Sequence, residues 1–237
     1  GEGVMPVAVT DGEPYWTAWI PKDAMPGEFN PPRGWTGTAN HDTRPDDYPY
    51  TYSTYFSPSY RYRRLIVLLE GAGRHSAQDH WSYMHDVGNM QAEFMVPILE
   101  PLLRAAGFDA MADMLRDWSH EDQALQREPL LYQLLYRELV LATFRDELGE
   151  SLTTELLGNW YYWQERFDRM VEDGDSSWFD NVDTTDVETL ADVVASAAAS
   201  TQERLNDFAP QASWGDAHRI TFVSPMRQSG AGSEWLG

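Results

Sequence analysis

The sequence of 237 residues contains no cysteine, which excludes disulfide bonds, thiolate catalysis and zinc–thiolate sites. Its six histidines form no HExxH or close HxH pattern, the arrangements that zinc hydrolases use. No stretch approaches the roughly 18 consecutive apolar residues of a membrane-spanning helix, and residues 1–10 lack the regions of a secretory signal. We therefore expect a soluble chain with no membrane partner.

Basic residues are also scarce: there are 17 against 38 acidic residues, for a formal net charge of −21, and Lys22 is the single lysine. Nucleic acid is not an expected partner, because phosphate binding needs a basic surface. The acidic residues are spread along the chain, so the surface repels itself at low salt and needs counterions. We interpret this as adaptation to concentrated salt, with an acidic binding face as the alternative.

The chain is nevertheless long and apolar enough to bury a core, as one large domain or two small ones. Residues 1–64 are rich in proline and aromatics and lack a helical period, which predicts short strands and ordered loops. Residues 65–213 form a helical part, and residues 214–237 return to strand-like sequence at 219–223 before a Gly- and Ser-rich end. The pattern predicts an α+β segment of a longer chain.

Apolar residues spaced three and four apart predict four amphipathic helices in the helical part. Their expected ranges are residues 80–106, 121–147, 152–172 and 185–208. Pro97 and Pro101 are expected to kink the first helix. Thr184 or Thr185 is the expected N-cap of the last one, with Glu188 at capping-box spacing from Thr185.

Short motifs follow one another along nearly the whole chain. They are Tyr15-Trp16 with Ile20-Pro21, Asn30-Pro31 with Gly34, Thr38-Ala39-Asn40, Asp47-Tyr48-Pro49-Tyr50, Tyr60-Arg61-Tyr62-Arg63-Arg64-Leu65, Gln91 with Pro97 and Leu102-Leu103, Trp178-Phe179-Asp180, and Trp214-Gly215-Asp216-Ala217-His218-Arg219. In this order they resemble the penicillin acylase (penicillin amidase) family of N-terminal nucleophile hydrolases. The resemblance implies a segment of the large (beta) chain and of an αββα sandwich.

The resemblance also implies a heterodimer cut autoproteolytically from one zymogen precursor, with the amino-terminal Ser of the large chain attacking an amide carbonyl and its own α-amine as base. Gly1 has no side-chain nucleophile, so the nucleophile is expected in a segment before it. The implied partners are the remaining parts of the same precursor, namely the alpha chain and the rest of the beta chain, and a small acylated substrate. The implied location lies outside the cytoplasm.

Two residues are candidates for the reaction. Asn40 matches the family's oxyanion-hole asparagine, the first of an Asn-Asn pair, although His41 replaces the second; its alternative is an ordinary turn asparagine. Arg61 matches a family arginine near the acyl pocket and nucleophile, where a fixed positive charge orients the substrate. Its alternative is a structural ion pair, and Arg63 and Arg64 compete for the role.

Calcium is the one cofactor that the resemblance implies. Pro6 matches a family position that lends its backbone carbonyl to the ion, while the matching downstream carboxylate is lost in the tyrosine-rich stretch of residues 50–55. Asp46 or Asp47 could substitute, because calcium prefers oxygen ligands.

The implied function is hydrolysis of the amide bond of a small N-acylated molecule, either a β-lactam side chain (hence antibiotic metabolism) or an acyl homoserine lactone. The alternative is a non-catalytic acidic helical binding module that kept the family's architecture. A Ser, Thr or Cys at a processing site before Gly1 would favour the enzyme.

The charge of −21 gives a first prediction. The melting temperature of the protein should rise between dilute buffer and molar salt, because counterions screen the repulsion among its carboxylates. Differential scanning calorimetry at both salt concentrations measures this, and an unchanged melting temperature would speak against salt adaptation.

Overall fold

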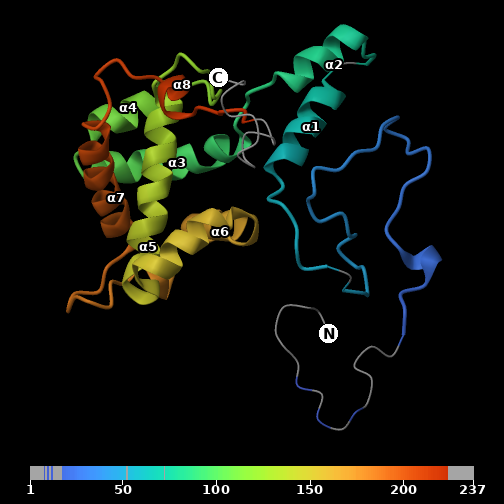
Figure 1. The fold of residues 1–237 in the computed structure, drawn as a ribbon, viewed down its shortest axis with the longest axis horizontal. Helices are drawn as coiled ribbons and strands as arrows, with labels where there is room; N and C mark the ends of the chain where they lie inside the picture. The colour runs from blue at the N-terminus through green and yellow to red at the C-terminus, as the bar shows by residue number, and fades with distance from the viewer. Residues whose placement is uncertain are drawn as a thin grey trace, which may run out of the picture.

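The computed structural model describes residues 18–51, 53–71 and 73–223, together with residues 8, 10 and 12. This part of the chain is mostly helical (Figure 1). Its α-helices are α1 (Tyr60–Glu70), α2 (Ala77–Met84), α3 (Met90–Ala105), α4 (Asp109–Asp117), α5 (Glu128–Gly158), α6 (Gln164–Asp173), α7 (Leu190–Leu205) and α8 (Trp214–Ala217). Three single-turn helices are η1 (Lys22–Ala24), η2 (Trp160–Tyr162) and η3 (Ser177–Phe179).

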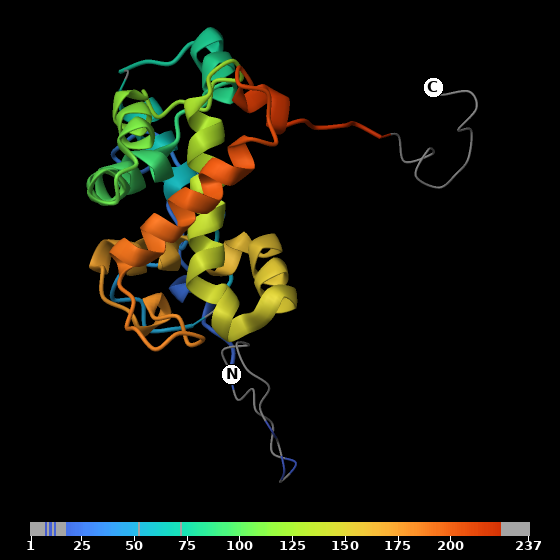
Figure 2. The same ribbon diagram turned by 90° about the vertical axis from the view of Figure 1, so that its left-hand side faces the viewer.

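The core lies among α3, α4, α5, α6 and α7, with α5 at its centre and α7 packed along it (Figure 2). Leu99 of α3, Leu135 and Leu139 of α5 and Val194 of α7 are all fully buried in it. Glu138 of α5 is buried as well, and Arg204 of α7 forms an ion pair with it. The helical part thus has one continuous apolar core.

The first expected helix, residues 80–106, is broken in two. Helix α2 ends at Met84, and Asn89 caps the N-terminus of α3 by accepting a hydrogen bond from the Ala92 N–H (2.9 Å). Between the two helices Gly88 forms an isolated antiparallel bridge with Glu121, which takes its backbone out of a helix. Pro97 and Pro101 lie inside α3 without ending it.

The break expected between residues 147 and 152 is present as a kink within α5. Gly149 has a non-helical backbone there, with φ 71° and ψ 169°, a conformation that glycine reaches at little steric cost, and it separates two helical stretches of α5. The expected helix at 152–172 is divided between the end of α5 and α6, and α4 was not expected at all. None of the described helices, α5 included, is long and apolar enough to cross a membrane.

The last expected helix begins five residues later than its earliest expected start. Thr189 precedes α7, and its N–H donates to the Asp192 carboxylate (2.9 Å). Glu188 makes no capping box with Thr185; its carboxylate accepts instead from the Thr184 hydroxyl (2.7 Å). The N-terminal cap of α7 is therefore the Thr189–Asp192 pair and not the expected pair of Thr185 and Glu188.

The expected strands do not form in the described part of residues 1–64 or at 219–223. Residues 25–51 and 53–59 run as turns and loops (Figure 1), with η1 just before them. A strand is stable only when its backbone pairs with a neighbour, and no described segment offers a paired edge here. The α+β expectation is therefore confirmed only in its helical half.

The central position of α5 gives a stability prediction. Leu139→Ala should lower the free energy of unfolding by about 2–5 kcal/mol, because it opens a cavity at a fully buried site. Leu125→Ala is the matched control, since Leu125 is 92% exposed. Urea unfolding followed by circular dichroism measures both, and equal losses would contradict this core.

Candidate functional site

Asn40 and Arg61 are in direct contact. The Arg61 Nη2 donates to the Asn40 Oδ1 (3.0 Å), to the Ala39 carbonyl (2.8 Å) and to the Ser57 hydroxyl (3.3 Å). Asn40 has a left-handed backbone with φ 63°, which asparagine tolerates better than most residues, and its carbonyl accepts from the Ser57 N–H (2.7 Å). The Arg61 side chain therefore connects residues 39 and 40 to Ser57.

This contact decides how the Asn40 amide is turned. A guanidinium can only donate hydrogen bonds, so it is the Asn40 oxygen, and not its NH₂ group, that must face Arg61. The Asn40 NH₂ then points away from Arg61, and within the described residues it donates to no protein acceptor. It is left as a free donor.

Both residues line a pocket of about 540 Å³. Its wall comes from the Asn40 loop, from α1, from the connection between α2 and α3, and from Gln164 at the start of α6. A free amide donor at a pocket that can hold a small molecule can stabilise a negative charge formed there.

The three arginines of the first turns of α1 have separate partners. Arg63 pairs with Glu165 (3.2 Å) and Arg64 with Asp86 (2.6 Å), whereas Arg61 forms no salt bridge among the described residues. Gly88 lets the Arg64 guanidinium come close, since a Cβ at Gly88 would lie 2.5 Å from it. Arg61 alone of the three contacts Asn40, and the described residues contain no ion pair for it.

His41 supports the Asn40 loop from inside. Its ring is buried and stacks on Tyr62 of α1, with ring centroids 3.6 Å apart. Burial lowers the pKa of His41, which favours the neutral ring. His41 is thus a packing residue in this chain.

A buried carboxylate lies next to the pocket. Asp168 of α6 is fully buried and accepts hydrogen bonds from the hydroxyls of Tyr60 in α1 and Tyr136 in α5, both at 2.7 Å, and from the Gln91 amide in α3 (3.0 Å). Tyr60 and Gln91 also line the pocket of Asn40. Burial raises the pKa of Asp168 to about 6, although its three donors oppose the shift.

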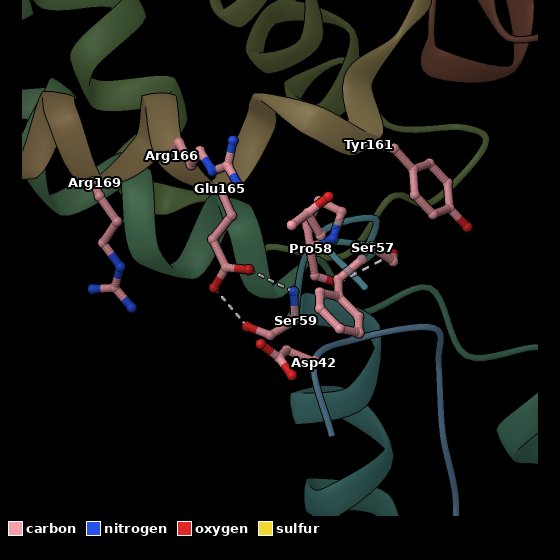
Figure 3. A pocket seen from close by; sticks show the side chains of 10 residues that line it. Asp42, Ser57, Pro58, Ser59, Tyr161, Glu165, Arg166 and Arg169 are labelled. Carbon is pink, nitrogen blue, oxygen red and sulfur yellow. Dashed lines mark hydrogen bonds between the residues drawn. The ribbon is translucent and has the colours of Figure 1, made fainter. Parts of the chain in front are cut away.

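A second carboxylate of α6 holds the start of α1. Glu165 accepts from the Ser59 N–H (2.7 Å) and the Ser59 hydroxyl (2.6 Å), as the dashed lines in Figure 3 show. It lines a second pocket, of about 560 Å³, with Arg166 and Arg169 of the same helix and Asp42 of the loop. The Ser59 side chain does not cap α1, and the hydrogen bonds at the start of this helix go instead to Glu165 of α6.

The expected calcium ligands do not form a site in the described residues. Pro6 lies outside them, Asp46 and Asp47 are exposed, and no group of three or more acidic or histidine side chains there could hold a metal ion.

Sequence reasoning named Asn40 and Arg61 but missed Asp168, Glu165 and Tyr136. One signal was available for Asp168: it lies between Phe167 and Val171 on the side of α6 that is buried. An acidic residue on an apolar helix face is unusual unless it has buried partners.

Comparison with known proteins gives a consistent result. The family model described as penicillin amidase matches residues 1–235. An acyl-homoserine lactone acylase QuiP of Pseudomonas putida is 25% identical over 251 residues, which cover 95% of this chain and 30% of the relative. A penicillin acylase 2 proenzyme of a Pseudomonas species is 36% identical over 77 residues, which cover 32% of this chain and 10% of the relative. The chain thus spans about 30% of the length of the QuiP relative that it matches.

The raised pKa of Asp168 predicts a pH-dependent stability. Its ordinary pKa is 3.8 and its folded one about 6, so its contribution to stability is complete below pH 3.8 and is lost as the pH rises through 6. Asp168→Asn does not titrate, so the difference in unfolding free energy between wild type and variant should shift by about 3 kcal/mol across this window, in favour of the wild type at low pH. Urea titrations at several pH values measure it, and parallel curves would contradict it.

Proposed function

The chain belongs to the penicillin amidase family, and from that premise we propose that it is part of an amide hydrolase acting on a small N-acylated molecule. The family is one of N-terminal nucleophile amidohydrolases, and this chain is a partial segment of such a protein. The names of its relatives support two substrate classes, acyl homoserine lactones and penicillins with an acyl side chain. The alignment with the lactone acylase is the longer of the two, so that class is tested first.

In the proposed reaction a hydroxyl from a segment outside this chain attacks the amide carbonyl carbon, and the attacking group's own α-amine takes its proton. The carbonyl electron pair moves onto oxygen and forms a tetrahedral oxyanion. When the oxyanion collapses, the C–N bond breaks and the amine leaves with a proton. Water then hydrolyses the acyl-enzyme and releases the acid.

The proposed role of this chain is to stabilise the oxyanion. The free Asn40 NH₂ would donate to the carbonyl oxygen, and this hydrogen bond strengthens as negative charge develops there. The Arg61 guanidinium would hold the amide in that orientation through Oδ1 and add a positive charge nearby. The observation that carries the proposal is the Arg61–Asn40 hydrogen bond beside a pocket of about 540 Å³.

Processing from a precursor, assembly with its other parts and a location outside the cytoplasm belong to the same proposal. So does calcium, whose ligands would come mainly from outside the described residues. Chelation and calcium addition to the complete protein, followed by calorimetry, tests for the ion directly.

The proposal predicts that Asn40→Ala in the complete protein lowers kcat for amide hydrolysis about a hundredfold to a thousandfold, as loss of one oxyanion donor does elsewhere. Asn40→Gly should have the same effect, because glycine keeps the left-handed backbone while removing the amide. Product release from an acyl homoserine lactone and from a penicillin measures the rate.

Asn30→Ala is the matched control. Asn30 is another exposed asparagine with a left-handed backbone, at φ 46°, and it lies outside the pocket of Asn40. It should keep full activity. Full activity of Asn40→Ala would reject the oxyanion role, and a wild type with no amidase activity would favour a non-catalytic binding module.

A further inference from the structure

Helix α1 is held in place by polar contacts more than by burial. None of its residues is fully buried, and Val67 is half exposed. Its links to the rest of the molecule include the Tyr60–Asp168 hydrogen bond, the Glu165 contacts at its start and the Arg64–Asp86 ion pair. The position of α1, and of the Arg61 side chain that it carries, therefore depends on a few specific contacts.

One of these contacts is made to a carboxylate that is itself fully buried. Asp168 is fully buried, whereas the side chains of Glu165 and Asp86 are 27% and 18% exposed. A hydrogen bond to an ionised group is stronger than one between neutral groups, and low dielectric strengthens it further. The Tyr60 hydroxyl, which donates to Asp168 at 2.7 Å, thus attaches α1 to the one fully buried carboxylate among these three partners.

We infer that Asp168 is a positioning residue for the reaction: through Tyr60 it fixes the first turn of α1 so that Arg61 reaches Asn40. Tyr60 and Arg61 are consecutive residues in that turn, and both line the pocket of about 540 Å³. The inference rests on the proposed function for its catalytic consequence. Its structural part, the attachment of α1, stands on the contacts alone.

A second hydroxyl donates to Asp168 and allows a comparison with that of Tyr60. The Tyr136 hydroxyl donates to Asp168 at the same distance, 2.7 Å, but it comes from α5 in the core and does not line the Asn40 pocket. Tyr60→Phe and Tyr136→Phe therefore remove one hydroxyl each from the same acceptor. Only the first removes a link to α1.

The test compares these two variants in the complete protein. Tyr60→Phe should lower kcat about tenfold, the effect of roughly one lost hydrogen bond to a charged group, and leave KM unchanged, because oxyanion stabilisation acts in the transition state. Tyr136→Phe should keep kcat within about twofold, although it too lowers stability. Asp168→Leu should lower kcat, and adding Tyr60→Phe to it should cause little further loss, because leucine accepts no hydrogen bond and the link to Tyr60 is already absent.

Hydrogen exchange supplies a readout that does not need activity. Tyr60→Phe should raise the exchange rate of the α1 amides, and Tyr136→Phe should leave it unchanged. Equal effects of the two variants on kcat, or on α1 exchange, would overturn the inference. If the wild type hydrolyses no amide while the exchange contrast is present, the proposed function fails and the attachment of α1 is upheld.

Discussion

The arrangement of the helices around the site depends on the hydrogen bonds that the Asp168 carboxylate accepts. This carboxylate is fully buried, and no cation pairs with it among the described residues. Such a group is costly unless hydrogen bonds satisfy it, and here donors from α1, α3 and α5 converge on it. The carboxylate requires donors at fixed positions, which sets where Tyr60, Gln91 and Tyr136 lie around α6.

Hydrogen bonds connect the Asp168 carboxylate to the pocket. Tyr60 and Gln91 contact both the carboxylate and the pocket, and Arg61 follows Tyr60 in the chain. Arg61 in turn leaves the Asn40 oxygen occupied and its NH₂ free. A donor that is already oriented before the substrate arrives needs no reorganisation when charge develops, which is how an oxyanion site lowers a barrier.

The sequence predicted what local patterns encode and missed what depends on distant partners. Apolar periodicity predicted most of the helical part, including the interruption near Gly149, but the break before Asn89 goes with a backbone bridge between Gly88 and Glu121 that no local pattern encodes. Asn40 and Arg61 were found through motif resemblance. Asp168 and Tyr60 are 108 positions apart, and no local pattern connects residues at that separation.

The central claim is that the Asn40 amide faces the charge of the reaction while Arg61 holds its oxygen. A crystal structure of the complete protein with a tetrahedral phosphonate analogue of an acyl homoserine lactone tests it most directly. The account predicts that the Asn40 Nδ2 donates to an anionic oxygen of the phosphonate at ordinary hydrogen-bond distance, with the Arg61–Asn40 hydrogen bond intact. A phosphonate bound with Asn40 turned to solvent, or with its Nδ2 against another protein group, would contradict it.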